Sequence, residues 1–230
     1  MALTVTHNNE HEPLFSNESL LTAVTSCSYG ALLYELLSEQ KPNAKELELF
    51  ELLLKFSIDH GPDTPSAKVT IAAARDGISM GKAVGDGMQM INETHGGAGE
   101  PAMRLFYDIA RGKMSAEEAV IQFIAQKKRL PGFGHRLYKK DPRAEFIVET
   151  INRLGFPKTY FTVAREMGEA LATQLPGKTL PLNIDGAIAA ALCTLGWKPA
   201  ASTALFIIAR SAGLCAHYLS SMQEFEGQEE

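Results

Sequence analysis

Residues 131–146 carry the stretch around which this sequence is organised, PGFGHRLYKKDPRAEF. It opens with a turn rich in proline and glycine, and glycine lets a backbone approach a ligand closely. His135 follows the turn, and a histidine can move protons near neutral pH. Asp141 and Pro142 then predict the start of a helix, because proline is favoured in the first helical turn. We therefore expect this segment to present a reactive side chain from a loop.

Four cationic residues lie within the eight positions from Arg136 to Arg143. The other two are Lys139 and Lys140. Guanidinium and ammonium groups bind phosphates and carboxylates, and a simple connection between helices needs no such cluster. The stretch therefore predicts an anionic ligand.

The bulk composition limits the classes of function. The chain has 230 residues, 45% of them hydrophobic and 21% charged, which predicts a soluble globular protein with a sizeable core. Its net charge of −5 argues against nucleic-acid binding, so any anion site must be local. Three cysteines without a CxxC pair predict neither a disulfide framework nor structural zinc, and favour the reducing cytoplasm. We expect no signal peptide, and no uninterrupted apolar run of about 20 residues that would span a membrane.

The apolar residues recur mainly with helical spacing, and no alternating run typical of strands stands out. The chain is therefore predicted to be all-α, with a loosely ordered start at residues 1–16. Residues 66–92 are rich in Ala and Gly, which predicts close helix crossings in the core or at a subunit interface. The predicted helices cover residues 18–38 (with a break near 28–30), 44–58, 66–92, 101–111, 115–128, 142–154, 158–174, 185–195 and 200–221.

Three of the six histidines adjoin glycine-containing elbows: His60, His95 and His135. Loops on a rigid scaffold commonly carry binding and catalytic residues, so these three are candidates for function. The alternative is a hydrogen-bonded structural role, which we favour for His217 inside the last predicted helix.

Residues 181–221 contain only three charged side chains, Asp185, Lys198 and Arg210. Asp185 is either a helix N-cap or a desolvated base whose pKa burial raises. Arg210 lies in an apolar helix, where a guanidinium is costly unless it meets an anion. That anion is Asp185, Glu166 or a ligand, and we favour a ligand.

Common nucleotide and metalloprotease motifs are missing from the sequence. It contains no HExxH, no GxGxxG after a strand and no GxxxxGK[ST]. We therefore expect no metal and none of those nucleotide folds.

Four segments occur in a recognisable order: HGGAGE at 95–100, PGFGHRLYKKDPRA at 131–144, LNIDGAI at 182–188 and LFIIARSAGLCAHYL at 205–219. With them the chain resembles the citrate synthase family, which includes the citryl-CoA lyases and the lyase part of ATP-citrate lyase. The resemblance implies an all-α homodimer whose active site lies between a large and a small domain. The large domain would comprise 1–96 and 197–230, and the small domain 97–196.

The resemblance also implies roles for individual residues. His95 resembles the histidine that stabilises the acetyl-CoA enolate. His135 resembles the histidine bonded to the oxaloacetate carbonyl or citryl hydroxyl, and Asp185 resembles the base at the methyl carbon. The residues that would bind the dicarboxylate are His60, Arg143 and Arg210. Those that would bind coenzyme A are Pro131, Gly132, Phe133, Gly134, Arg136, Lys139 and Lys140.

The activity expected from this resemblance is that of a citryl-CoA lyase, which converts citryl-CoA to acetyl-CoA and oxaloacetate. It uses a coenzyme A thioester as substrate and no permanently bound cofactor. The expected partners are a second copy of the chain, through residues 66–92, and a citryl-CoA synthetase.

The sequence departs from the family pattern in three ways. The chain is short for a citrate synthase, no Lys or Arg follows Arg210, and the segment from His135 to Arg143 is one residue shorter than usual. The alternatives are a citrate or 2-methylcitrate synthase, a non-catalytic CoA-binding protein and a purely structural helical bundle.

Overall fold

The computed structural model describes residues 6–8, 11–16, 18–92, 96–135 and 138–226. Within these ranges the chain forms eleven α-helices and three short β-strands, so the predicted helical class is confirmed. The chain divides into two compact units, Met1–Leu52 and Leu53–Glu230, and each is described by itself. The family-based division at residues 96 and 196 stays a prediction.

A small antiparallel sheet opens the first unit. Its strands, in chain and spatial order, are β1 (Thr6–His7), β2 (Pro13–Phe15) and β3 (Glu18–Ser19). Leu14 in the central strand pairs with Thr6 on one side and Ser19 on the other. The expectation of a loosely ordered start is therefore wrong for the described part of residues 1–16. Strands this short show no alternation that periodicity can detect.

Helices follow the sheet: α1 (Leu20–Ser26), α2 (Tyr29–Ser38) and α3 (Ala44–Ser57), the last of which continues into the second unit. The break between α1 and α2 lies close to the predicted position. Ser28 ends it, because its hydroxyl accepts a hydrogen bond from Ala31 N–H (3.2 Å) and so caps α2. α3 begins with a reciprocal cap, in which Glu46 N–H donates to Asn43 Oδ1 (3.1 Å) and Asn43 N–H donates to Glu46 Oε2 (2.8 Å).

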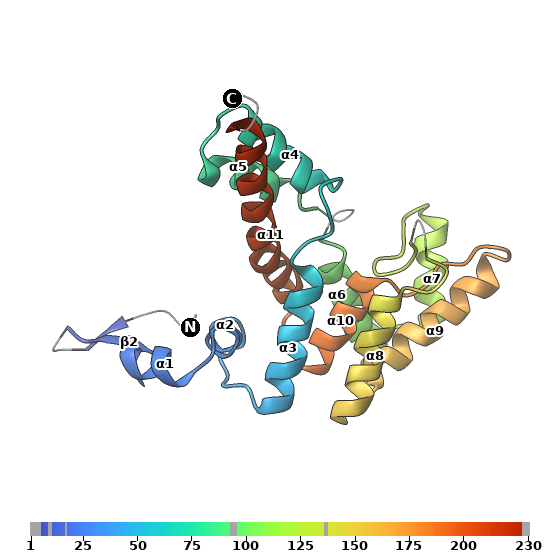
Figure 1. Cartoon of the computed structure of the whole chain (residues 1–230). Coiled ribbons are helices and arrows are strands. Elements are labelled where there is room, and N and C mark those ends of the chain that lie inside the picture. The colour runs from blue at the N-terminus through green and yellow to red at the C-terminus, as the bar shows by residue number, and fades with distance from the viewer. Residues whose placement is uncertain (1–5, 9–10, 17, 93–95, 136–137, 227–230) are drawn as a thin grey trace. The chain divides into compact units, whose positions relative to one another are not determined.

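The second unit is a helical assembly built around α10. Its helices after α3 are α4 (Pro65–Arg75), α5 (Met80–Gln89), α6 (Gly99–Ala110), α7 (Ala116–Ala125), α8 (Pro142–Leu154), α9 (Thr159–Gln174), α10 (Ile184–Thr194) and α11 (Ala200–Glu226). α10 contacts α6, α8, α9 and α11, whereas α11 runs along α4 and α5 (Figure 1). Every residue from Gly186 to Cys193 is buried. The many alanines of α10 let its neighbours approach closely, since the distance between helix axes depends on the side chains at the contact.

The stretch 66–92 differs from its prediction as one helix. α4 and α5 are separate helices joined by a turn in which Gly77 has a φ of 71°. The predicted close crossing is nevertheless present, because Thr70 Oγ1 donates to Ala83 O across the two helices (3.2 Å). A Cβ on Gly87 would lie 2.2 Å from Thr70 Oγ1, so glycine is needed there. The small residues therefore fold the stretch back on itself.

α11 is unusually long and apolar. By length and composition alone, Ala200–Met222 could cross a membrane, a property shared by core helices of soluble proteins. Here α11 packs against α4, α5 and α6, and its Arg210 is 0% exposed. The expectation of no membrane span stays a prediction.

Candidate functional site

The loop before His135 is fastened to the segment that precedes α10. Gly134 N–H donates to Pro181 O (2.8 Å), and Asn183 N–H donates to Gly132 O (3.0 Å). The Asn183 side chain adds a third bond, from Nδ2 to Gly134 O (3.0 Å). These bonds hold the backbone ahead of His135 next to the N-terminus of α10.

Glycine is required where this loop meets the helix. Gly132 has a φ of 82°, and a Cβ on it would lie 2.7 Å from Gly186 Cα. A Cβ on Gly186 would in turn lie 2.4 Å from Gly132 O. Since two backbones touch here without side chains between them, the loop lies directly on the first turn of α10.

Asp185 lies in that first turn, but it does not cap the helix. The N-cap is Asn183, whose Oδ1 accepts from Gly186 N–H (3.1 Å). The capping interpretation of Asp185 is therefore wrong. The carboxylate is left available for another role.

The surroundings of Asp185 favour its protonated form. Burial raises the pKa of the carboxyl above its usual range, and the charge of Asp141 adds to this effect. The positive charges of Arg143 and Arg210 act in the opposite direction. Asp185 is thus a desolvated acid close to two guanidinium groups, as expected of a group that exchanges protons with a substrate.

Asp141 is an organising residue that the sequence analysis treated only as a helix start. Its side chain is fully buried, and both carboxylate oxygens are used. Oδ1 accepts from Arg143 Nε (3.0 Å), and Oδ2 accepts from Arg143 Nη2 (2.8 Å) and from Ile184 N–H (3.1 Å). Burial opposes its ionisation, but the bonds from Arg143 lower the pKa of Asp141. One carboxylate therefore holds Arg143 beside the helix that carries Asp185.

His135 lies beside Arg143. Its Nε2 is 3.4 Å from Arg143 Nη2, and its ring stacks on Tyr138 with centroids 4.4 Å apart. Tyr138 N–H donates to His135 Nδ1 (3.1 Å). A guanidinium nitrogen can only donate, so each ring nitrogen of His135 faces a donor, and a neutral imidazole can accept from only one of the two at a time.

Arg210 is the least satisfied polar residue of the described chain. It is fully buried, and its Nη1 and Nη2 have no hydrogen-bond partner among the described residues. Nε donates weakly to Ser57 O (3.3 Å), and the guanidinium lies over the Phe206 ring, 4.7 Å from its centroid. Desolvation lowers the pKa of Arg210. An anionic ligand would supply acceptors to these nitrogens and so offset the desolvation cost of the buried cation.

His60 belongs to the same neighbourhood. It follows α3, and its Nε2 lies 3.0 Å from Phe56 O. Displacement of water, together with the charges of Arg210 and Arg143, lowers the pKa of His60 to about 4. The structure thus brings His60, Arg143, Arg210 and Asp185 into one electrostatic cluster.

Two predicted site residues, His95 and Arg136, lie outside the described residues. The elbow after His95 is described from Gly96, which has a φ of 76°. A Cβ on Gly96 would lie 2.1 Å from the Phe206 ring, and the same ring is 6.4 Å from that of His60. Gly96 therefore lies directly against the side of α11 that carries Arg210.

The residues predicted to bind coenzyme A lie in several settings. Lys140 forms an ion pair with Glu145, Lys139 is exposed, and Pro131 is partly buried beside Gly132. Phe133 pairs with Leu182 in an isolated bridge.

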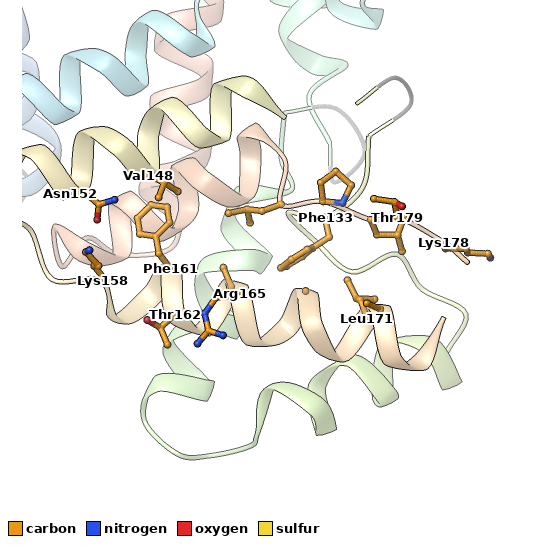
Figure 2. A pocket seen from close by; sticks show the side chains of 16 residues that line it. Phe133, Val148, Asn152, Lys158, Phe161, Thr162, Arg165, Leu171, Lys178 and Thr179 are labelled. Atoms are coloured by element: carbon orange, nitrogen blue, oxygen red, sulfur yellow. The ribbon is translucent and has the colours of Figure 1, made fainter. Parts of the chain in front are cut away.

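The Phe133 ring lines a cavity of about 580 Å³ between α8 and α9. Figure 2 shows Phe133, Lys178 and Thr179 at one end of this cavity and Lys158 near the other. The wall is mainly apolar, with cations at its edges. The cavity lining does not include Asp185, Arg143 or Arg210.

The chemistry available to the cluster is acid–base chemistry on an anion. It combines a desolvated carboxyl, an imidazole and two guanidinium groups. In the part of the chain that the structure describes, no group of three or more His, Cys, Asp and Glu residues is placed to hold a metal ion.

Comparison with known proteins shows the family to which this chain belongs. The family model described as "Citrate synthase, C-terminal domain" matches residues 1–227, so the chain belongs to the citrate synthase family. Citrate synthase 2 of Bacillus subtilis is 33% identical over 191 residues, which are 80% of this chain and 49% of that protein. Citrate synthase of Haloferax volcanii is 28% identical over 206 residues, 86% of this chain and 53% of that protein. The chain spans about half the length of these curated relatives.

Two solved structures show how far the similarity in fold extends along the chain. Citryl-CoA lyase from Hydrogenobacter thermophilus has a TM-score of 0.88 and 33% identity, and the match covers 96% of this chain and 86% of that one. A citrate synthase from Thermoplasma acidophilum, in a ternary complex with carboxymethyl coenzyme A and oxaloacetate, has a TM-score of 0.71 and 25% identity. That match covers 86% of this chain and 54% of the other. The predicted family and its helical fold are confirmed.

Proposed function

We propose that this chain is a citryl-CoA lyase, which cleaves citryl-CoA into acetyl-CoA and oxaloacetate. The observation that carries the proposal is the buried guanidinium of Arg210, whose charge acts on Asp185 and His60. Its terminal nitrogens lack partners among the described residues. A substrate carboxylate would supply the missing acceptors. The extensive similarity to the H. thermophilus citryl-CoA lyase supports the lyase over other family activities.

The dicarboxylate part of the substrate would lie among His60, Arg143 and Arg210. Arg143 is held in place by Asp141 before any ligand arrives. Arg210 is buried but open to a new acceptor. One pre-oriented and one unsatisfied guanidinium would together orient the carbon–carbon bond to be broken.

Cleavage begins when the citryl hydroxyl gives its proton to His135. The hydroxyl-bearing carbon then becomes the ketone of oxaloacetate, and the electron pair of the broken bond moves into the thioester as an enolate. His95 would stabilise the enolate oxygen. Asp185, whose pKa burial raises, would donate its proton to the carbon and yield the acetyl-CoA methyl group.

A second candidate is the condensing direction, citrate or 2-methylcitrate synthesis. The similarity to curated citrate synthases favours it, since citrate synthase 2 of Bacillus subtilis is 33% identical over 80% of this chain. In this direction His135 would donate a proton to the ketone oxygen of oxaloacetate. Asp185 would then act as the base that removes a methyl proton.

Coenzyme A would follow the backbone of Gly132–Gly134, which hydrogen bonds to Pro181 and Asn183 already hold in place. Lys139 is exposed and available for a phosphate, whereas Lys140 would have to leave Glu145. A homodimer through α4 and α5, action with a citryl-CoA synthetase and a cytoplasmic location belong to the same proposal. Sedimentation at micromolar concentration tests the dimer.

The function is tested by two parallel incubations of the purified chain. Citryl-CoA alone should give acetyl-CoA and oxaloacetate. Oxaloacetate with acetyl-CoA should give little free coenzyme A. Rapid release of coenzyme A with citrate from the second mixture would replace the lyase with the synthase. Thermal stabilisation by coenzyme A without turnover in either mixture would favour a non-catalytic binding protein.

A further inference from the structure

The elbow that carries His60, residues 57–61, is attached to one face of α11. Ser57 O accepts from Arg210 Nε at 3.3 Å. One turn further along α11, Gly213 lies against Ile58, and a Cβ on Gly213 would be 2.2 Å from Ile58 O. The two α11 positions are three apart and therefore share a helix face.

The third attachment is a hydrogen bond between Asp59 and His217, one further turn along the same face. His217 Nε2 is 3.0 Å from Asp59 Oδ1, and the two side chains are 18% and 39% exposed. The other oxygen of Asp59, Oδ2, accepts from Gly61 N–H (3.0 Å). Asp59 therefore joins the elbow both to α11 and to its own turn.

His60 lies between the two groups that this carboxylate fixes. The preceding residue, Asp59, is bonded to His217, and the following residue, Gly61, donates its N–H to Asp59. The backbone of His60 is therefore held on both sides. The charge of Asp59 also acts on His60 and on Arg210, and in each it favours the protonated form. A change at Asp59 therefore alters both the position and the electrostatics of this half of the cluster.

We propose that Asp59 and His217 are a positioning pair, which fixes His60 relative to Arg210 and thereby sets the affinity for a substrate carboxylate. The identity of the ligand rests on the proposed function, whereas the placement of His60 by Asp59 and His217 does not depend on that function. His217 is placed outside the reacting atoms and acts through Asp59. The hydrogen bond agrees with the structural role expected of His217, and the proposal adds an effect on the site.

The first test measures geometry without turnover. In protein labelled with ¹⁵N-histidine, the His60 ring signals are identified by their loss in His60→Asn. His217→Leu removes the hydrogen bond, and the His60 signals should move. His217→Gln places an amide nitrogen near the position of Nε2, and the signals should stay. Unmoved His60 signals in His217→Leu would overturn the proposal whether or not the chain is a lyase.

The second test measures affinity by calorimetry with oxaloacetate and, separately, with coenzyme A. His217→Leu should weaken oxaloacetate binding about tenfold, the loss expected for one charge-assisted hydrogen bond, with unchanged coenzyme A binding. His217→Gln should restore most of that affinity. Equal weakening of both ligands, or equal loss in the Leu and Gln variants, would contradict a positioning role.

Matched changes at the elbow complete the design. Asp59→Leu keeps a side chain of similar size without any acceptor oxygen, so it removes the bond to His217 and should reproduce the His217→Leu result if that variant folds poorly. Asp63→Ala removes a nearby carboxylate that is 94% exposed and should leave oxaloacetate affinity unchanged. A wild-type chain that binds no oxaloacetate would reject the proposed function, and the His60 signals would still decide the positioning role.

Discussion

The positive charges of Arg143 and Arg210 both lower the pKa of Asp185, but the two guanidinium groups differ in their hydrogen-bond partners. Arg143 donates from Nε and Nη2 to the buried carboxylate of Asp141. Arg210 is more deeply buried, but its terminal nitrogens have no acceptor among the described residues, and only a weak bond and the Phe206 ring compensate. Arg143 therefore has its acceptors within the chain, whereas the terminal nitrogens of Arg210 lack one in the part of the chain that the structure describes.

This difference shows how a site can be both rigid and receptive. Arg143 is oriented in advance, so little order has to be created when a ligand binds. Arg210 instead keeps an unfavourable desolvation in the free protein, which a carboxylate can relieve. Removal of the two arginines should therefore affect stability in opposite directions.

The largest effect is expected at Asp185, on which both arginines act. Asp185→Asn removes the group that exchanges a proton with carbon and should lower turnover by roughly a thousandfold. Binding of coenzyme A should remain nearly intact, because the loop that would hold it does not depend on this carboxylate. Turnover of citryl-CoA and calorimetry with coenzyme A check the two parts. Normal turnover in the variant would refute the proposed mechanism.

The second-largest effect is expected when Arg210 is removed. Arg210→Met should weaken oxaloacetate binding by about a hundredfold and raise the free energy of unfolding by about 1–3 kcal/mol. Calorimetry and urea unfolding measure the two changes. Arg104→Gln, which removes an exposed arginine paired with Glu100, is the control and should alter each by little. A loss of stability in Arg210→Met would mean that Arg210 already has a partner.

Removal of the paired cation should have the opposite effect on stability. Arg143→Met leaves Asp141 buried and unpaired, so the free energy of unfolding should fall by about 3 kcal/mol. Asp141→Asn/Arg143→Met should recover part of the loss, since the amide carries no charge and still offers one acceptor to Ile184 N–H. Urea unfolding of the three proteins measures this. A double variant less stable than Arg143→Met would contradict the assignment.

The smallest effect concerns the protonation of His60. The pKa of His60 is about 4 in the free protein, so the ring is neutral at pH 7. An oxaloacetate carboxylate beside Arg143 and Arg210 should favour the charged ring and raise this pKa by about one unit. Titration of the His60 signals with and without oxaloacetate measures the change. A pKa that is unchanged or lower with bound oxaloacetate would place the ligand elsewhere.

Local patterns predicted most of the helices but not the connections between them. α8 and α9 begin and end close to the predicted residues, because caps and apolar spacing are encoded within each segment. The turn between α4 and α5 was missed, since its small residues fit a continuous helix as well as a tight crossing. At α10, Asp185 and Asn183 are both good caps, and only the structure shows that Asn183 takes the role.

Site residues could be predicted where a charged residue stands out in an apolar stretch of sequence. Arg210 stood out because few charged residues surround it in the sequence, and its terminal nitrogens have no hydrogen-bond partner among the described residues. Asp141 could not be recognised as an organising residue, because its bond to Ile184 N–H joins residues 43 positions apart. The Asp59–His217 pair spans 158 positions, and periodicity carries no information at that distance.

The direct contact of Gly132 with Gly186 has a consequence for motion. With no side chain between the two backbones to shear or re-pack, the loop and the first turn of α10 must travel as one body. Any opening that admits a substrate must therefore bend at other points of the chain. We expect hydrogen exchange to show the amides of Gly134 and Asn183 among the slowest loop amides, even while neighbouring loops open.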